Sequence, residues 1–153
     1  MYSLLRQLCQ VHSPSGEEEE MKKFILNYVK ENQHRWKTKP EVIHGSDFQD
    51  CLMLSFGNPS VAAVAHMDTT GFTVRYQNQL VPVGSPDVEK EDRLCGRDSL
   101  GLIECGVKID EDYHVFYDFP RQVQTGTSLT YVKNFDEDDT FIYAPYLDNR
   151  AGI

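Results

Sequence analysis

The run from Val61 to Phe72 constrains the fold more than any other stretch of the chain. It reads Val-Ala-Ala-Val-Ala-His-Met-Asp-Thr-Thr-Gly-Phe, so five small or β-branched apolar residues precede His66 and Asp68. Such a run is typical of a strand that is buried on both faces of a sheet. In open α/β sheets, ligands bind outside the carboxyl ends of the strands. The run therefore predicts a buried strand that delivers His66 to a functional site.

Asp68 follows His66 by two positions, and alternation along an extended chain places both side chains on one face. A carboxylate there accepts the N–H of one ring nitrogen and leaves the other nitrogen for a metal ion. The same residues also fit a plain strand end, at which His66 closes the strand and Asp68 begins a turn. His-x-Asp alone is a short pattern, so both interpretations stay open at this point.

Composition narrows the class of protein. The 153 residues carry a formal net charge of -9, and a surface of this sign repels nucleic acid and anionic membranes. We expect neither as a partner. The longest apolar run, Val61 to Ala65, is too short to span a membrane, and the first residues lack the pattern of a signal peptide, so we expect a cytoplasmic protein. Reduced, structural thiols are expected for the scattered cysteines: Cys9, Cys51, Cys95 and Cys105.

The first part of the chain carries two helical patterns. Apolar residues at helical spacing predict a short helix that ends at Ser13-Pro14, and a second apolar stripe predicts a helix that fades near Asn32. Between them, Ser15-Gly-Glu-Glu18 has the form of a capping box. The acidic run Glu17 to Glu20 fits a solvated helix start better than a cation site, because the helix dipole favours negative charge there.

The rest of the chain has the character of strands. Short segments at 42–44 and 51–56 precede the Val61 run, and a Gly-Asn-Pro turn suggests a hairpin leading into it. Between Phe72 and Tyr143, β-branched and aromatic segments alternate with glycines and acidic turns, which predicts a small all-β module, a barrel or a curled sheet. Asp136 to Asp139 fits a solvated hairpin tip, since it lacks the alternating ligands of a calcium loop.

The last ten residues, Ala144 to Ile153, contain a second junction. Pro145 closes the β module, and Asp148 precedes residues that are suited to opening a helix. A carboxylate at such a junction either caps the helix or binds a cation, and the residues alone do not decide between the two roles.

The two junctions together resemble a known family. His66-Met-Asp68 followed by Gly71-Phe72, the Leu147-Asp-Asn-Arg-Ala-Gly152 run and the amino-terminal Ser-Pro-Ser-Gly-Glu-Glu segment resemble the TET-type dinuclear metalloaminopeptidases, which include the glutamyl and deblocking aminopeptidases of metallopeptidase family 42. The resemblance implies an α/β fold, in which a small β-barrel-like dimerisation domain is inserted into an α/β/α catalytic domain. Its parts are then residues 1–70 (catalytic), 71–143 (inserted) and 144–153 (return to the catalytic domain).

The resemblance also implies roles for particular residues. It makes His66 a ligand of one metal ion, Asp68 the carboxylate that orients His66, and Asp148 the carboxylate that bridges two metal ions, zinc or cobalt. Two ions roughly 3.5 to 4 Å apart activate a shared water and polarise the scissile carbonyl of a peptide substrate. A glutamate takes the proton from that water in the family. Homo-oligomers through the inserted domain are implied as well.

Three departures from the family pattern bear on this interpretation. Thr69-Thr70 replace an acidic residue followed by Ile or Val, and Asn149 replaces the second aspartate of Asp-Asp-Arg. The family's glutamate pair, a further aspartate and its final histidine have no counterpart before Ile153. We therefore expect the amino-terminal portion of an aminopeptidase, without the general-base glutamate and inactive alone. Two alternatives stay open: a related dinuclear metal amidohydrolase or dipeptidase, and a non-enzymatic β-rich assembly module.

Overall fold

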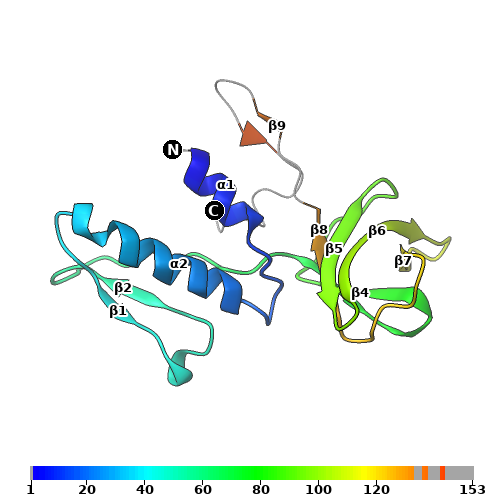
Figure 1. Ribbon diagram of the computed structural model, residues 1–153, viewed down its shortest axis with the longest axis horizontal. Helices are drawn as coiled ribbons and strands as arrows, with labels where there is room; N and C mark the ends of the chain where they lie inside the picture. The colour runs from blue at the N-terminus through cyan, green and yellow to red at the C-terminus, as the bar shows by residue number, and fades with distance from the viewer. Residues whose placement is uncertain (1, 133–135, 138–141, 144–153) are drawn as a thin grey trace. The chain divides into compact units, whose positions relative to one another are not determined.

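A computed structural model describes residues 2–132, 136–137 and 142–143 of the chain. Helices and strands are both present, and the chain divides between Asp68 and Thr69 into two compact units (Figure 1). Among the described residues, no helix combines the length and the apolar character that crossing a membrane requires.

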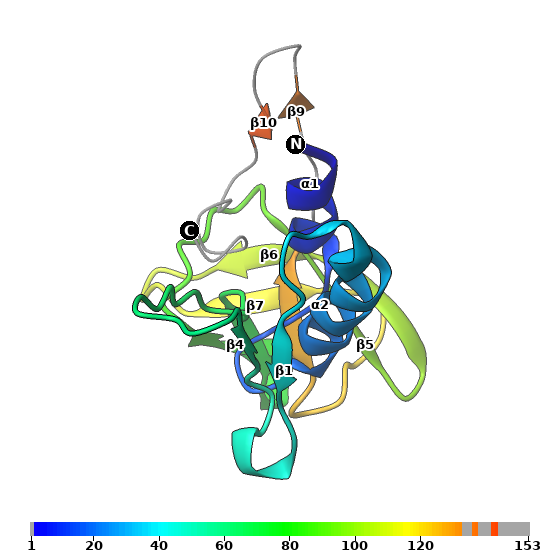
Figure 2. The same cartoon turned by 90° about the vertical axis from the view of Figure 1, so that its left-hand side faces the viewer.

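The first unit contains two α-helices and a small hairpin. Helix α1 spans Tyr2–Gln10 and α2 spans Glu19–Asn32, close to the predicted helices. One short 3-10 turn, η1 (Gln33–Arg35), follows α2, and another, η2 (Ser46–Phe48), connects strands β1 (Glu41–Ile43) and β2 (Met53–Ser55). The two strands pair antiparallel, with Val42 opposite Leu54. Helix α2 lies alongside this hairpin in both views (Figures 1 and 2).

The second unit is a closed six-stranded antiparallel barrel, which confirms the predicted β module. Its strands follow one another around the barrel in the order β3-β4-β7-β6-β5-β8, and β3 pairs with β8 to close it. A 3-10 turn, η3 (Tyr76–Asn78), joins the first two strands. The strand bounds are β3 Gly71–Val74, β4 Gln79–Val83, β5 Arg93–Asp98, β6 Gly101–Ile109, β7 Val115–Asp118 and β8 Ser128–Tyr131. Beyond the barrel strands, β9 (Asp136–Glu137) pairs with β10 (Ile142–Tyr143).

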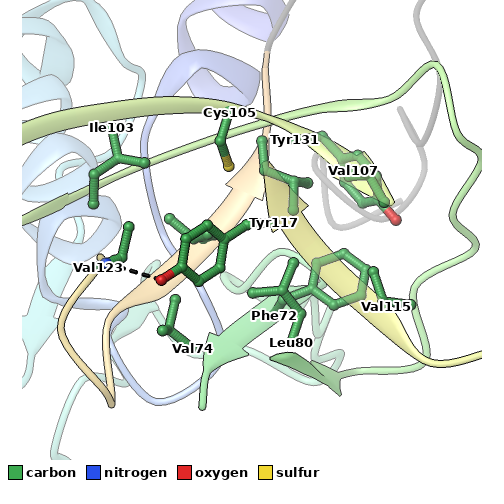
Figure 3. Packing of buried hydrophobic residues seen from close by; sticks show 12 residues of the cluster. Phe72, Val74, Leu80, Ile103, Cys105, Val107, Val115, Tyr117, Val123 and Tyr131 are labelled. Carbon is green, nitrogen blue, oxygen red and sulfur yellow. Dashed lines mark hydrogen bonds between the residues drawn. The ribbon is translucent and has the colours of Figure 1, made fainter. Parts of the chain in front are cut away.

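Alternation along the strands fills the barrel interior. In β6, Ile103, Cys105 and Val107 are buried while their neighbours face outward, the period of two that a half-buried strand requires. Phe72 meets Tyr131 edge-on, with ring centroids 6.1 Å apart. The remaining core side chains, most of them labelled in Figure 3, are Val74, Leu80, Leu94, Val115, Tyr117, Val123 and Leu129.

Two details of the barrel differ from the predicted strands. The segments expected at 100–103 and 107–109 form one strand, β6, because Gly106 stays in register between Arg93 and Asp118. Strand β5 has no counterpart in the prediction. Its sequence, Arg-Leu-Cys-Gly-Arg-Asp, has only two apolar residues, Leu94 and Cys95, yet Leu94 is fully buried and the strand pairs along its length with β6.

Candidate functional site

The Val61 run does not form the predicted buried strand. Residues 61–68 have no strand conformation, and the side chains of Val61 and Val64 are 84% and 95% exposed. A strand that is buried on both faces needs paired neighbours and a covering layer on each side. In the described part of the first unit, β2 pairs with β1, and this two-stranded sheet does not include the run. The prediction is therefore wrong for this structure.

His66 and Asp68 nevertheless lie together. The Nδ1 atom of His66 is 2.9 Å from the backbone oxygen of Asp68 and 3.3 Å from its Oδ1 atom. The backbone oxygen can only accept a hydrogen bond, so this contact requires the proton on Nδ1 and, in a neutral ring, leaves the lone pair on Nε2. The two side chains are 44% and 36% exposed. This is the arrangement in which a metal-binding histidine is oriented by a carboxylate and a carbonyl.

A serine-rich loop before α2 contacts the same segment. The Ser15 hydroxyl donates to Asp68 Oδ2 at 2.5 Å, and the Ser13 hydroxyl donates to the Met67 carbonyl at 2.7 Å. The predicted capping box is thus wrong. Glu18 is the N-cap residue of α2 and makes no side-chain cap, while its carboxylate accepts the Gly16 N–H at 2.6 Å. The local sequence around Ser15 favours a helix cap. Its actual partner, Asp68, is 53 positions away, so no local pattern indicates this contact.

The acidic run before and within α2 agrees with a solvated helix start. Glu19 and Glu20 are exposed and pair with Lys23, at 3.1 Å and 3.0 Å. With His12, Glu17 and Asp50 they line a shallow acidic hollow in the first unit. A negative helix start of this kind is stabilised by the helix dipole without any bound cation.

Among the described residues, His66 Nε2 could supply one ligand to a metal ion. No group of three or more His, Cys, Asp or Glu side chains in the described ranges is placed to hold one. Asp148, the predicted bridging carboxylate, lies outside the described residues. The four cysteines are free thiols: Cys9, Cys51, Cys95 and Cys105. Burial raises the pKa of the Cys105 thiol to about 11, which makes it a poor metal ligand at neutral pH.

The molecule is a chain of mixed helices and strands with a closed six-stranded antiparallel barrel. Its candidate site is a half-exposed histidine, His66, that contacts Asp68. No protein-family model matches the chain, and no curated protein does so.

Proposed function

We propose that the chain is part of a dinuclear metal-dependent aminopeptidase, which hydrolyses amino-terminal residues from peptides. The observation that carries the proposal is the contact between His66 Nδ1 and Asp68, which reserves Nε2 for a metal ion. The motif resemblance assigns Asp148 as the bridging carboxylate. The first unit then belongs to an α/β/α catalytic domain, into which the barrel is inserted.

Each residue has one task in this proposal. Asp68 holds the His66 ring through the Nδ1 hydrogen, and His66 and Asp148 hold the ions. When bound, two zinc or cobalt ions polarise the scissile carbonyl and lower the pKa of a water molecule. A general-base glutamate is needed to take the proton of that water. Because no group of three or more His, Cys, Asp or Glu side chains in the described ranges is placed to hold a metal ion, we propose that this glutamate and the other ligands come from elsewhere in the complete enzyme.

The barrel supports homo-oligomerisation as part of the proposal. Its apolar core comes from its own strands and from Val123 in the segment between β7 and β8, so its outer surface is available for contacts. On the hairpin of β5 and β6, Leu100 and Leu102 are 71% and 74% exposed. Exposed apolar side chains that lie close together are common at protein interfaces. The same self-sufficient barrel is also what favours the alternative of a non-enzymatic assembly module.

An assay of substrate class tests the function. Protein isolated from its natural source and loaded with zinc or cobalt is given unblocked tripeptides and, separately, N-acyl amino acids. We expect release of the amino-terminal residue from the tripeptides, reduced more than about 100-fold in His66→Ala, because loss of a ligand exceeds the loss for an outer partner. The matched control is His44→Ala, an exposed histidine, which keeps the rate.

Two other outcomes of this assay would contradict the proposal, and each would assign one of the alternatives. Hydrolysis of the N-acyl amino acids in place of the tripeptides assigns the amidohydrolase alternative. An absence of metal-dependent hydrolysis of both substrates assigns the assembly module. For the isolated 153-residue chain we expect no release, and measurable metal-dependent release by it would show that its own residues supply the general base.

A further inference from the structure

We propose that Ser15 and Ser13 are positioning residues for the His66–Asp68 pair. Together they hold the segment from His66 to Asp68 so that Asp68 keeps His66 in the tautomer with the proton on Nδ1. The consequence for metal binding rests on the proposed function. The hydrogen bonds that support the proposal lie within this chain and do not depend on that function. We call the two hydroxyls and their acceptors, Asp68 Oδ2 and the Met67 carbonyl, the serine clamp.

Ser15 fixes the carboxylate itself. Its hydroxyl lies 2.5 Å from Asp68 Oδ2, the length of a strong hydrogen bond from a hydroxyl to a carboxylate. The other oxygen, Oδ1, faces His66 Nδ1 at 3.3 Å. With Oδ2 occupied by Ser15, rotation of the carboxylate group is restricted, and Oδ1 stays on the histidine side. One carboxylate thus links the serine to the imidazole ring.

Ser13 fixes the backbone between the two members of the pair. Its side chain is fully buried, and its hydroxyl donates to the carbonyl of Met67 at 2.7 Å. Met67 separates His66 from Asp68, and the backbone oxygen of Asp68 is the nearer acceptor of the imidazole, at 2.9 Å. Holding the Met67 carbonyl therefore also restricts the position of that acceptor. Reactive or ligand groups need this kind of support to stay within a fraction of an ångström of a working geometry.

The position of these serines is not explained by the helix that follows them. Helix α2 begins at Glu19, and no side chain caps it. The Gly16 N–H donates to the Glu18 carboxylate, so this donor does not use the Ser15 hydroxyl as its acceptor. His66 and Asp68 are both partly exposed, and water competes for their polar atoms. The hydrogen bond from Ser15 gives the Asp68 carboxylate a partner within the protein and so reduces the effect of that competition.

Nitrogen NMR of the imidazoles tests the clamp in the metal-free 153-residue chain at mildly alkaline pH. Wild-type His66 is expected to show the Nδ1–H tautomer. In Ser15→Ala we expect the Nε2–H form of His66 to grow at its expense, while Ser15→Thr, which retains a hydroxyl, keeps the wild-type spectrum. His114 is the internal reference, since its Nδ1 contacts Asp110 Oδ2 at 3.1 Å and the other Asp110 oxygen accepts backbone N–H groups. Ser60→Ala is the control for an exposed serine.

Zinc titration of the same substitutions, made in the complete enzyme, separates this proposal from the proposed function. We expect Ser15→Ala to weaken zinc binding at His66 about tenfold, the lower end of the loss for a partner that orients a ligand. A changed tautomer with no zinc binding by wild type would support the clamp and contradict the metal site. Zinc binding that depends on His66, with tautomer and affinity unchanged in Ser15→Ala, would overturn the clamp and leave the metal site standing.

Discussion

Asp98 is the most strongly held carboxylate among the described residues with a resolved pKa shift. Its two oxygens contact the Arg121 guanidinium at 2.6 Å and 2.8 Å, and its side chain has no exposed surface. Oδ1 also accepts the Leu100 N–H at 2.9 Å. The hydrogen bonds from Arg121 lower the pKa of Asp98 to about 2, below its ordinary value of 3.8. A bidentate pair of this kind joins the turn between β5 and β6 to the segment before β8.

This shift predicts a loss of stability in acid. A carboxylate whose pKa is lower in the folded state stabilises the fold above its unfolded pKa, and the contribution is lost as the pH falls towards the folded pKa. For Asp98 the window runs from pH 3.8 down to about 2. Thermal unfolding of wild type and Asp98→Asn across that range should show the difference between them shrinking as the pH falls. A difference that is the same at pH 6 and pH 2 would contradict this assignment.

Tyr117 combines a buried ring with one polar contact. Its hydroxyl accepts the backbone N–H of Val123 at 2.9 Å, and both residues are almost fully buried (Figure 3). In Tyr117→Phe that N–H loses its partner inside the core, so we expect a loss of about 1–3 kcal/mol in the free energy of unfolding. Denaturant titration measures it. The control is Tyr113→Phe, at an exposed tyrosine, and equal stabilities of the two variants would contradict the role of the hydrogen bond.

At the scale of the element, the barrel depends on a close approach where β3 meets β8. A Cβ atom added to Gly71 would lie 2.4 Å from the Leu129 carbonyl oxygen, a backbone atom that moves only with its strand. We expect Gly71→Ala to separate these strands and to cost about 1–3 kcal/mol, as overpacking does. Gly106→Ala is the matched control, because its added Cβ would have a single neighbour, at 3.9 Å. Denaturant unfolding compares the two variants, and equal losses would contradict the argument.

The elements show what local sequence predicts well and what it does not. The helices and most barrel strands follow from periodicity, because each element carries its own apolar pattern. Strand β5 was missed, since Leu94 is its only fully buried apolar side chain and pairing with β6 supplies the rest. The Val61 run has the composition of a buried strand, but burial needs neighbouring strands that the described residues do not place around it.

The candidate site also contains one contact that local sequence predicts and one that it does not. His66 and Asp68 are two positions apart in sequence, so the spacing predicts their contact, and the structure shows that contact. The link from Ser15 to Asp68 crosses 53 positions, and no local pattern indicates it. Local rules instead assigned Ser15 to the helix cap, which is the usual role of a serine at such a place.

In the whole molecule, the two units differ in how much core they contain. The barrel has a continuous apolar cluster drawn from all six of its strands. In the described part of the first unit the buried apolar side chains are Cys9, Met21 and Val29 with two prolines, Pro14 and Pro40, and the Val61 run is exposed. A unit with a small core and an exposed apolar segment gains stability from further contacts. This agrees with our proposal that the site is completed by residues outside the described ranges.

The most direct test of the central claim, that His66 is a metal ligand oriented by Asp68, is the zinc content of the complete enzyme from its natural source. Mass spectrometry measures it after equilibration with zinc and removal of the excess. We expect bound zinc in wild type and in His44→Ala, and its loss in His66→Ala. Equal zinc contents in wild type and His66→Ala, or no bound zinc in wild type, would contradict the claim.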